Sequence, residues 1–360
     1  MEAITREEKI ISGENLTPIT RKEMFLAKAA GMDVETPEPI TREEIFLSKI
    51  QGGSGGGTGG DSVEEWIGDG KTHLWIKIAA EGRMDVPLYF QQTVANGVTI
   101  DWGDGSATET LSGGINVNTT HTYAAIGEYV ISLDVADGCT LGFGHGSMNG
   151  CVMGSIDSPN RVYCNMLKKV EIGNGVTSIG DYAFQCCLSL ASIVIPEGVM
   201  SIGIQAFLYC LSLASIVIPE GVTSIDGSTF SDCRSLASIV IPEGVTSIAN
   251  SVFNSCSSLA SIVIPEGVTS IEDYAFKDCL SLASIVIPEG VMSIGFQAFI
   301  ACCGMKFYDF TKHIAVPTLS NANVFKYIPS DCEIRVPAAL YDEWISATNW
   351  STYADKIVAV

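Results

Sequence analysis

Residues 190–212 read LASIVIPEGVMSIGIQAFLYCLS, and close copies of this 23-residue stretch recur along the chain. The repeating unit is L-A-S-I-V-I-P-E-G-V-T-S-I-x-x-x-A-F-x-x-C-x-S. Such a unit is too short to bury its own apolar face, so successive units must stack and share a core. Three residue types keep the 23-residue step: Phe184, Phe207, Phe230, Phe253, Phe276 and Phe299; Cys187, Cys210, Cys233, Cys256, Cys279 and Cys302; and Pro196, Pro219, Pro242, Pro265 and Pro288.

Each unit predicts one short strand that ends at its proline. In residues 192–195, alternation places Ile193 and Ile195 on the inner face and Val194 on the outer one. The rest of the inward set is Leu190, Val199, Ile202, Ala206, Phe207 and Cys210. We expect the strands to lie in one parallel sheet, centred near Val170, Ile193, Ile216, Ile239, Ile262 and Ile285.

The pattern L-x-x-I-x-I-P-x-x-V-x-x-I-x-x-x-A-F-x-x-C, seen from Leu190 to Cys210, resembles the BspA-like class of leucine-rich repeats. The resemblance covers about Leu167 to Cys303, with Thr229 and Val252 replacing the alanine before phenylalanine. It implies a right-handed solenoid with a parallel sheet on one side, in a bacterial or phage surface protein that binds other surfaces. The expected fold is therefore mainly β, with the solenoid over residues 165–303.

The chain has 12 cysteines, and the repeated ones allow two interpretations. They are either buried, reduced thiols that act as small apolar fillers, or a metal or disulfide ladder. No CxxC or Cys/His cluster supports a zinc site, so the filler interpretation is favoured and no cofactor is expected. In the adjacent pairs Cys186-Cys187 and Cys302-Cys303 only one side chain can face inward, which predicts Cys186 and Cys303 as the most exposed thiols.

Residues 1–51 carry three capping boxes, formed by Thr5 with Glu8, Thr20 with Glu23 and Thr41 with Glu44. Each precedes an apolar run, which predicts short amphipathic helices that either fray as a tail or dock to an assembly or to a second copy. This spacing weakly resembles N-terminal segments of phage and prophage virion proteins. Residues 52–60 form a glycine-rich linker.

Residues 61–140 predict a β-sandwich with strands over 72–78, 87–90, 98–102 and 129–135. The stretches W-G-D-G-S at 102–106 and H-T-Y at 121–123 resemble the PKD-type immunoglobulin-like domain. Trp102 and Tyr123 are expected in its core, with the tyrosine hydroxyl bonded to backbone. Asp101 and Asp104 either cap the turn or bind Ca²⁺.

Residues 141–164 are predicted as a connector and an N-terminal cap of the solenoid; the glycines at 142–146 lack the context of a phosphate loop. Residues 304–360 are predicted as the C-terminal cap. Tyr308 and Phe310 take inward repeat positions, residues 332–337 form one last strand, and a helix starts at Pro337. Trp344, Trp350 and Tyr353 cover the open end.

The chain carries 20 basic and 41 acidic side chains, a net charge of −21, which argues against a nucleic-acid partner. No apolar run of about 18 residues predicts membrane insertion, and residues 1–8 do not resemble a secretory signal. No catalytic motif involves the histidines or the repeated turn glutamates. The four histidines are His73, His121, His145 and His313, and the turn glutamates are Glu197, Glu220, Glu243, Glu266 and Glu289. The turn glutamates are either solvated carboxylates or a weak divalent-cation strip.

Three classes of function therefore compete. The favoured one is an adhesin-like recognition protein on a virion or extracellular surface that binds a protein or glycan of a cell surface. The others are a structural spacer or virion decoration without a ligand, and an enzyme, the least favoured. Specificity needs chemical variety, which favours the segment around each phenylalanine over the uniform Ser/Val face of the strands. The predicted ligand-binding residues are Tyr182, Gln205, Tyr209, Tyr274 and Gln297.

Overall fold

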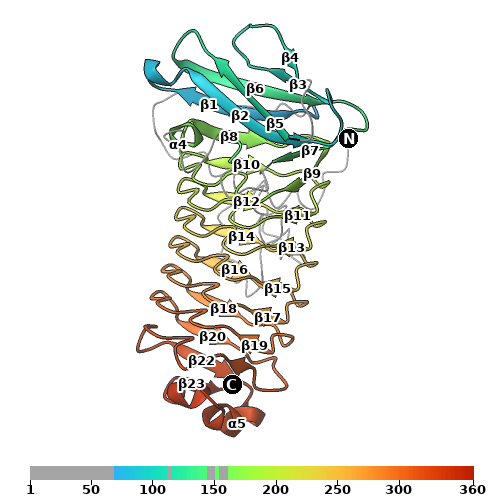
Figure 1. The fold of residues 1–360 in the computed structure, drawn as a ribbon. Helices are drawn as coiled ribbons and strands as arrows, with labels where there is room; N and C mark the ends of the chain where they lie inside the picture. The colour runs from blue at the N-terminus through green and yellow to red at the C-terminus, as the bar shows by residue number, and fades with distance from the viewer. Residues whose placement is uncertain (1–68, 112–115, 144–150, 154–160) are drawn as a thin grey trace, which may run out of the picture. The chain divides into compact units, whose positions relative to one another are not determined.

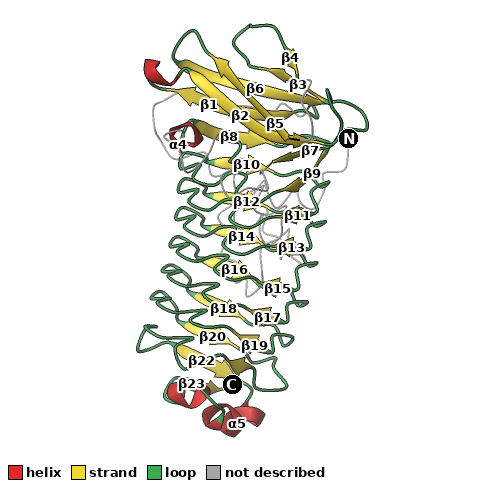
Figure 2. Ribbon diagram, viewed as in Figure 1, coloured by secondary structure: helices red, strands yellow, loops and turns green. Residues whose placement is uncertain are grey.

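A computed structural model describes residues 69–111, 116–143, 151–153 and 161–360. The predicted capping-box helices of residues 1–51, the linker at 52–60 and the glycine-rich stretch from Gly144 to Ser147 lie outside the described residues. In the described part, no helix has the length and apolar character needed to cross a bilayer. The fold there is mainly β, with few helices (Figure 2).

Each 23-residue coil contributes two short parallel strands, stacked coil on coil (Figure 1). The first strands are β8 (Leu167–Glu171), β10 (Ser192–Val194), β12 (Ser215–Val217), β14 (Ser238–Val240), β16 (Ser261–Val263) and β18 (Ser284–Val286). The second strands are β9 (Val176–Ile179), β11 (Ser201–Ile202), β13 (Ser224–Ile225), β15 (Ser247–Ile248), β17 (Ser270–Ile271) and β19 (Ser293–Ile294). The six predicted strand centres, from Val170 to Ile285, are all buried, as expected.

The prediction of one continuous sheet was wrong at its last strand. β8, β10, β12, β14 and β16 pair in one sheet, whereas β18 begins another with β20 (Phe307–Asp309), β22 (Glu333–Val336) and β23 (Ile357–Ala359). The N–H of Ala283 still donates to the carbonyl of Ala260, but over 3.4 Å, compared with 3.1 Å from Ala260 to Ala237 one coil earlier. The corresponding bond from Ala214 to Ala191 is 3.5 Å although β10 and β12 pair, so its length does not account for the break between β16 and β18.

The segment around each phenylalanine, which we call the Phe segment, forms a third ladder between coils. In the first coil the N–H groups of Tyr182, Phe184 and Cys186 donate to carbonyls of the next coil over 2.9, 2.8 and 2.8 Å. Two residues of each Phe segment adopt left-handed backbone with φ between 52° and 62°, although none is glycine. They are Tyr182, Gln205, Ser228, Ser251, Tyr274 and Gln297, and four residues later Cys186, Tyr209, Asp232, Ser255, Asp278 and Ala301.

Inside the coils, the repeated phenylalanines stack face to face. Ring centroids are 5.4 Å apart for Phe184 and Phe207 and 5.5 Å for Phe207 and Phe230, with interplanar angles of 7° and 3°. Thr229, which replaces alanine, is buried because its hydroxyl donates to the carbonyls of Gly203 and Asp226. The inward set predicted from the repeat therefore forms the solenoid core.

The described part of the N-terminal β region continues both layers of the solenoid. Its strands are β1 (Thr72–Ile78), β2 (Asp85–Gln92), β3 (Val98–Asp101), β4 (Glu109–Thr110), β5 (Asn116–Thr122), β6 (Gly127–Val135) and β7 (Leu141–Phe143). β1 pairs antiparallel with β8, and β7 pairs with β9, so two sheets run from this region into the coils. The predicted connector thus contains a strand at 141–143, because the first coil would otherwise present two open strand edges.

The turn at 101–106 agrees with its capping interpretation. Asp101 accepts a hydrogen bond from the Gly103 N–H at 2.9 Å, and Asp104 accepts one from the Ser106 N–H at 3.0 Å. Both glycines of the turn have positive φ, as their positions predict. Trp102 and Tyr123 are buried, and the Tyr123 hydroxyl donates to the Trp102 carbonyl at 2.8 Å.

The C-terminal residues extend the solenoid before they close it. Phe325 stacks on Phe299 at 5.5 Å, and β21 (Thr318–Leu319) pairs with β19, so one further, longer coil precedes the cap. The strand at 333–336 is not the last, because β23 follows it. The predicted helix is divided into a 3-10 turn (Ala338–Leu340) and α5 (Tyr341–Ser346). Tyr308, Phe310, Trp344, Trp350 and Tyr353 are buried at this end, as predicted.

Candidate functional site

The five predicted ligand-binding residues all occupy left-handed positions of the Phe segments. Tyr209 is exposed, whereas the other four are half-buried. Tyr182, Gln205 and Tyr209 belong to the first two coils, and Tyr274 and Gln297 belong to the fifth and sixth. Coils are spaced by about 4.8 Å, the distance between neighbouring strands. Gln205 and Tyr274 are three coils apart, so the five residues form two groups on one edge and not one patch.

Part of the variation at this edge is structural. Asp273 Oδ1 accepts a hydrogen bond from the Phe296 N–H of the next coil at 2.5 Å, and a Cβ added to Gly295 would lie 2.4 Å from the Asp273 nitrogen. Gly295 therefore allows the close approach of the backbone at Glu272 and Asp273 that this hydrogen bond accompanies. Asp181 and Gly203 repeat this arrangement, with a bond of 2.9 Å to the Ile204 N–H.

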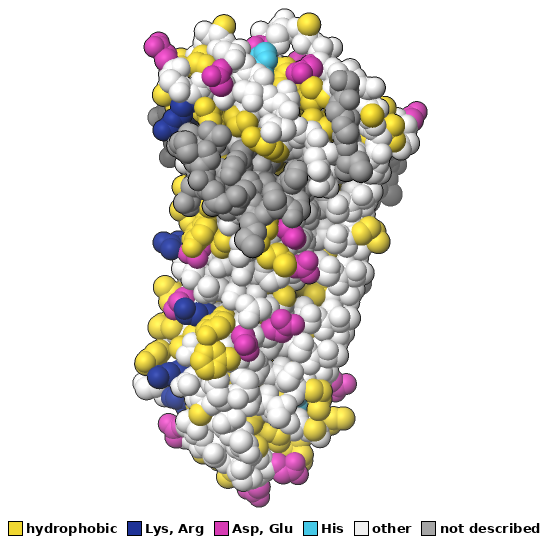
Figure 3. Space-filling model, in the orientation of Figure 1, with side chains coloured by type: hydrophobic (Ala, Val, Ile, Leu, Met, Phe, Trp, Pro, Cys, Tyr) yellow, Lys and Arg dark blue, Asp and Glu magenta, His cyan; other side chains and the backbone are white. Residues whose placement is uncertain are grey.

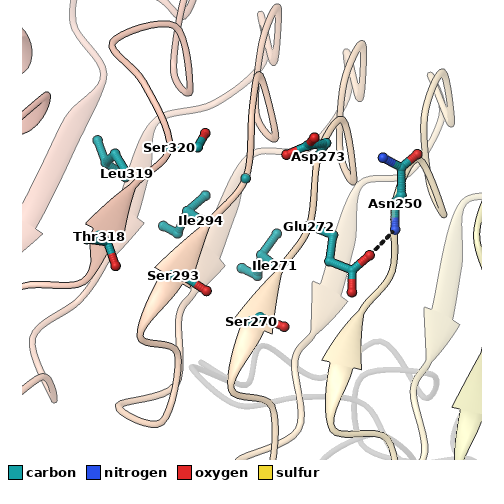
Figure 4. Close-up of a pocket in the computed structure, with 11 residues that line it drawn as sticks. Asn250, Ser270, Ile271, Glu272, Asp273, Ser293, Ile294, Thr318, Leu319 and Ser320 are labelled. Atoms are coloured by element: carbon teal, nitrogen blue, oxygen red, sulfur yellow. Dashed lines mark hydrogen bonds between the residues drawn. The ribbon is translucent and has the colours of Figure 1, made fainter.

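A groove of about 480 Å³ lies along the second strands beside the C-terminal group (Figure 4). Its floor follows β17, β19 and β21, and its side is the start of the Phe segments. Glu272 accepts a hydrogen bond from the Asn250 N–H at 3.0 Å and thereby holds two neighbouring coils together. The lining residues are Asn250, Ser270, Ile271, Glu272, Asp273, Ser293, Ile294, Gly295, Thr318, Leu319 and Ser320.

The groove combines hydroxyl groups with carboxylates and has no basic side chain in its lining. Aromatic residues stand directly after it in the chain, since Tyr274 follows Asp273 and packs edge-to-face on Phe296 at 5.3 Å. Lys277 Nζ lies 5.9 Å from the centre of the Tyr274 ring. On the face shown in Figure 3, basic side chains gather along one margin, apart from most of the acidic ones. Tyr274 and Gln297 remain predicted ligand-binding residues and are not in the lining of the groove. The groove itself was missed because its hydroxyls belong to the invariant part of the repeat.

The outer Ser/Val columns of the first strands are less uniform than the repeat suggests. Val194 and Val286 are exposed, while Val217, Val240 and Val263 are half-buried. The repeated turn glutamates are all exposed. The carboxylate of Glu266 lies 3.7 Å from Lys312 Nζ.

The cysteine column is buried from Cys187 to Cys302, which agrees with the filler interpretation. Cys303 is exposed, as predicted, but the prediction for Cys186 was wrong because its side chain is only 3% exposed. Burial is the main cause of the raised pKa of the Cys210 thiol, and Cys186 also contributes to it. A cluster of three thiols, Cys151, Cys164 and Cys187, was missed because only Cys187 belongs to the recognised repeats.

One hydrogen-bonded chain joins a serine, a histidine and an aspartate. His73 Nδ1 lies 2.9 Å from Ser132 Oγ, and its Nε2 lies 2.9 Å from Asp69 Oδ1. His73 and Ser132 face each other across the β1–β6 pair, and the imidazole is only 2% exposed. A buried imidazole in the middle of a sheet has no access to a substrate, so these contacts support the β region and not catalysis.

Comparisons with known proteins agree with the repeat. The sequence profile of the BspA-type leucine-rich repeat region matches in six copies, over residues 155–260 and 200–330. Among curated proteins, none matches the chain significantly.

Three solved structures are similar to parts of the chain. A leucine-rich repeat protein of T. pallidum is 31% identical over 45% of this chain and 78% of its own, with a TM-score of 0.42. A leucine-rich cell surface protein from Faecalibacterium prausnitzii is 29% identical over 50% of this chain and 58% of its own, with a TM-score of 0.40. The pneumococcal vaccine antigen PcpA is 14% identical over 54% and 68%, with a TM-score of 0.36. Because these TM-scores are low, the assignment rests on the repeat sequence and on the identity shared with the T. pallidum protein. On that evidence, this chain belongs to the BspA-type leucine-rich-repeat family.

Proposed function

We propose that this protein is a non-enzymatic, adhesin-like recognition protein that binds a ligand in the groove along β17, β19 and β21. The observation that carries the proposal is the groove itself, beside Tyr274 and Gln297 on the chemically varied edge. The cell-surface description of the F. prausnitzii relative supports a location on an extracellular surface, and a virion surface is the other location we propose.

The lining favours an uncharged, hydroxyl-rich ligand such as a neutral glycan. Side-chain hydroxyls of Ser270, Ser293 and Thr318 can donate to and accept from sugar hydroxyls, and Glu272 and Asp273 accept hydrogen bonds. The same two carboxylates repel an anionic ligand, which would be buried beside them without a basic partner. Tyr274 directly follows the lining residue Asp273 in the chain, and its ring is of the kind that recognition sites use.

Binding to an array of neutral and sialylated glycans, and to whole bacterial cells, tests this proposal. Ser293→Arg fills the groove with a long side chain, and Ser261→Arg places the same side chain at an exposed position of a first strand. We expect Ser293→Arg to abolish binding and Ser261→Arg to retain it, with both variants melting near the wild-type temperature. Equal binding by both variants would exclude the groove.

A second comparison separates the edge from the strand face. Alanine at Tyr182, Tyr209 and Tyr274 together should weaken binding if the Phe segments contact the ligand. Glutamate at the exposed Val194 and Val286 should have no effect on it. If binding survives the tyrosine changes and fails in the valine variant, the Ser/Val strip is the site.

The alternative function is a spacer or virion decoration without its own ligand. The two sheets that run from the N-terminal β region into the coils support it, because a shared sheet makes the two parts one stiff unit. We propose that this β region is of the PKD type, on the strength of the Tyr123–Trp102 bond. A protein that binds neither cells nor glycans would favour the spacer.

The partner proposed for residues 1–51 is a virion assembly or a second copy of the chain, through the apolar runs that follow the capping boxes. Deletion of residues 1–51 should leave a folded protein of lower apparent mass by light scattering. An unchanged number of chains per particle, with normal incorporation into the assembly, would contradict this role.

A further inference from the structure

Three thiols meet at the N-terminal end of the cysteine column. Cys164 closes the short helix α4 (Arg161–Cys164), Cys187 lies in the first Phe segment, and Cys151 belongs to neither. The Sγ atoms of Cys164 and Cys151 are 3.1 Å apart, and those of Cys151 and Cys187 are 3.7 Å apart. All three sulfurs lie within 4.8 Å of one another, and all three residues are fully buried.

The contacts of this cluster differ from those of the cysteine column. Cys210, Cys233, Cys256, Cys279 and Cys302 each donate to the carbonyl of the phenylalanine 26 residues earlier, over 3.1–3.2 Å. Residue 161, which holds that position for Cys187, is an arginine, and the sulfur of Cys187 contacts that of Cys151 instead. A cysteine that serves only as a filler needs no second and third sulfur beside it, so this end of the column has a different chemistry.

We propose that Cys151, Cys164 and Cys187 form a three-thiolate site for a soft, thiophilic metal ion, and that Cu(I) is the ion it fits. Thiolate sulfur is the donor that Cu(I) prefers in proteins. Metal–sulfur bonds of about 2.3 Å place the sulfurs of a trigonal site about 4 Å apart. The Cys151–Cys187 distance of 3.7 Å is close to this value, and the sulfurs of Cys151 and Cys164, at 3.1 Å, would move apart by roughly 1 Å on binding. Structural zinc takes four ligands, and among the described residues no fourth cysteine, histidine or carboxylate joins this group.

The site would join the β region to the first coil. The Tyr89 N–H donates to the Val152 carbonyl at 2.9 Å, and the Val152 N–H donates to the Ala183 carbonyl at 2.8 Å, so the residue after Cys151 already bridges β2 and the first Phe segment. A metal bound by Cys151, α4 and the first coil would strengthen this connection. Each Cu–S bond forms as the thiol releases its proton to solvent, so binding weakens as the pH falls.

The test is a titration of the full-length, reduced protein with Cu(I) under anaerobic conditions, in competition with the chelator bicinchoninate. We expect one Cu(I) per chain and an X-ray absorption spectrum with three sulfur neighbours. Cys151→Ser, Cys164→Ser and Cys187→Ser should each weaken Cu(I) binding by more than about 10-fold. Loss of a residue that merely hydrogen-bonds to a metal ligand already costs that much, and loss of the ligand itself costs at least as much. Cys256→Ser, which alters the column but not the cluster, is the matched control and should bind as the wild type does.

The wild-type spectrum keeps the proposal testable if a cluster variant fails to fold. Fewer than three sulfur neighbours, or nitrogen or oxygen ligands, would overturn the site. So would an equal loss of binding in Cys256→Ser, or a Cys151–Cys164 disulfide in protein purified without reductant. Binding of zinc but not of Cu(I) at the three cysteines would overturn the choice of metal.

Discussion

The thiol of Cys233 donates a hydrogen bond to the backbone carbonyl of Phe207, in the preceding coil, at 3.2 Å. The same carbonyl also accepts the Cys210 N–H at 3.1 Å, so the thiol is a second partner for a buried oxygen. Each cysteine from Cys210 to Cys302 is thus buried and bonds to the backbone of the coil before it. This thiol contact adds to the backbone ladder that already joins the Phe segments of successive coils.

We expect Cys233→Ala to lower the free energy of unfolding by about 1–3 kcal/mol, since it removes a buried side chain and a hydrogen bond. Cys303→Ala should change it little, because Cys303 is exposed. Chemical denaturation of both variants checks this. Equal losses in the two would show that the column contact contributes nothing specific.

The phenylalanine stack should be the most sensitive part of the core. Phe253 lies between Phe230 and Phe276, with ring centroids 5.9 and 5.5 Å away. Phe253→Ala should cost about 3–5 kcal/mol, the usual price of an unfilled aromatic cavity. Phe296 is half-buried at the edge, so Phe296→Ala should cost clearly less. Urea denaturation of the two variants compares them directly, and a larger loss at Phe296 would contradict this packing.

Left-handed backbone at Ala301 predicts that glycine stabilises this position. Its φ is 60°, which costs a residue with a Cβ roughly 1–2 kcal/mol, more than the extra entropy that glycine loses on folding. Ala301→Gly should therefore raise the free energy of unfolding by about 0.5–1 kcal/mol. Ala283 is the control, because it is not among the residues with positive φ. Ala283→Gly should lower the free energy of unfolding by about 0.5–1 kcal/mol. If thermal melts show that both substitutions lower stability, the strain inferred at Ala301 is contradicted.

Neighbouring Cys302 and Cys303 should differ sharply in reactivity. Burial raises the pKa of Cys302 to about 12, so almost no thiolate exists there at pH 8, whereas Cys303 is exposed. Labelling of the native, reduced protein with iodoacetamide, followed by peptide mass spectrometry, should modify Cys303 and spare Cys302. Cys210, Cys233, Cys256 and Cys279 should also remain unmodified until the protein unfolds. Rapid labelling of any of these would contradict the buried column.

The turn at Asp104 predicts a loss of stability in acid. The Ser106 hydrogen bond, and then that of His121, lower the pKa of Asp104 to about 2 from an ordinary value of 3.8. A carboxyl whose pKa is lowered by folding stabilises the fold above its unfolded pKa and loses that contribution as pH falls through the folded one. Melting temperatures of the wild type should therefore decline between about pH 4 and pH 2, and Asp104→Asn should decline less. Parallel curves for the two proteins would show that this carboxyl does not contribute.

Much of the solenoid is determined by the sequence alone. A residue that recurs every 23 positions meets its own copies in the stack, so Phe207 must lie on Phe184, and Ile193, Ile216 and Ile239 must share one face. The same logic placed Tyr308 and Phe310 inside the last coils and the tryptophans of the C-terminal end over the core. Local turn chemistry sufficed for the glycines at 103 and 105, whereas Trp102 and Tyr123 were placed in the core through the motifs that resemble a known domain.

Other features depend on contacts between residues far apart in the chain, and only the tertiary structure decided them. The left-handed positions appear at tyrosine, serine and cysteine, because the bonds to the next coil, not the local residue, select that backbone. Cys151 meets Cys187 across 36 residues, and β1 pairs with β8 across about 90, because the open end of the first coil must be covered. The groove arises from hydroxyls that every coil repeats. Whether a given hydroxyl lines the groove depends on the non-repeated residues next to it, which here are Glu272, Asp273 and Gly295. The repeat pattern does not contain that information.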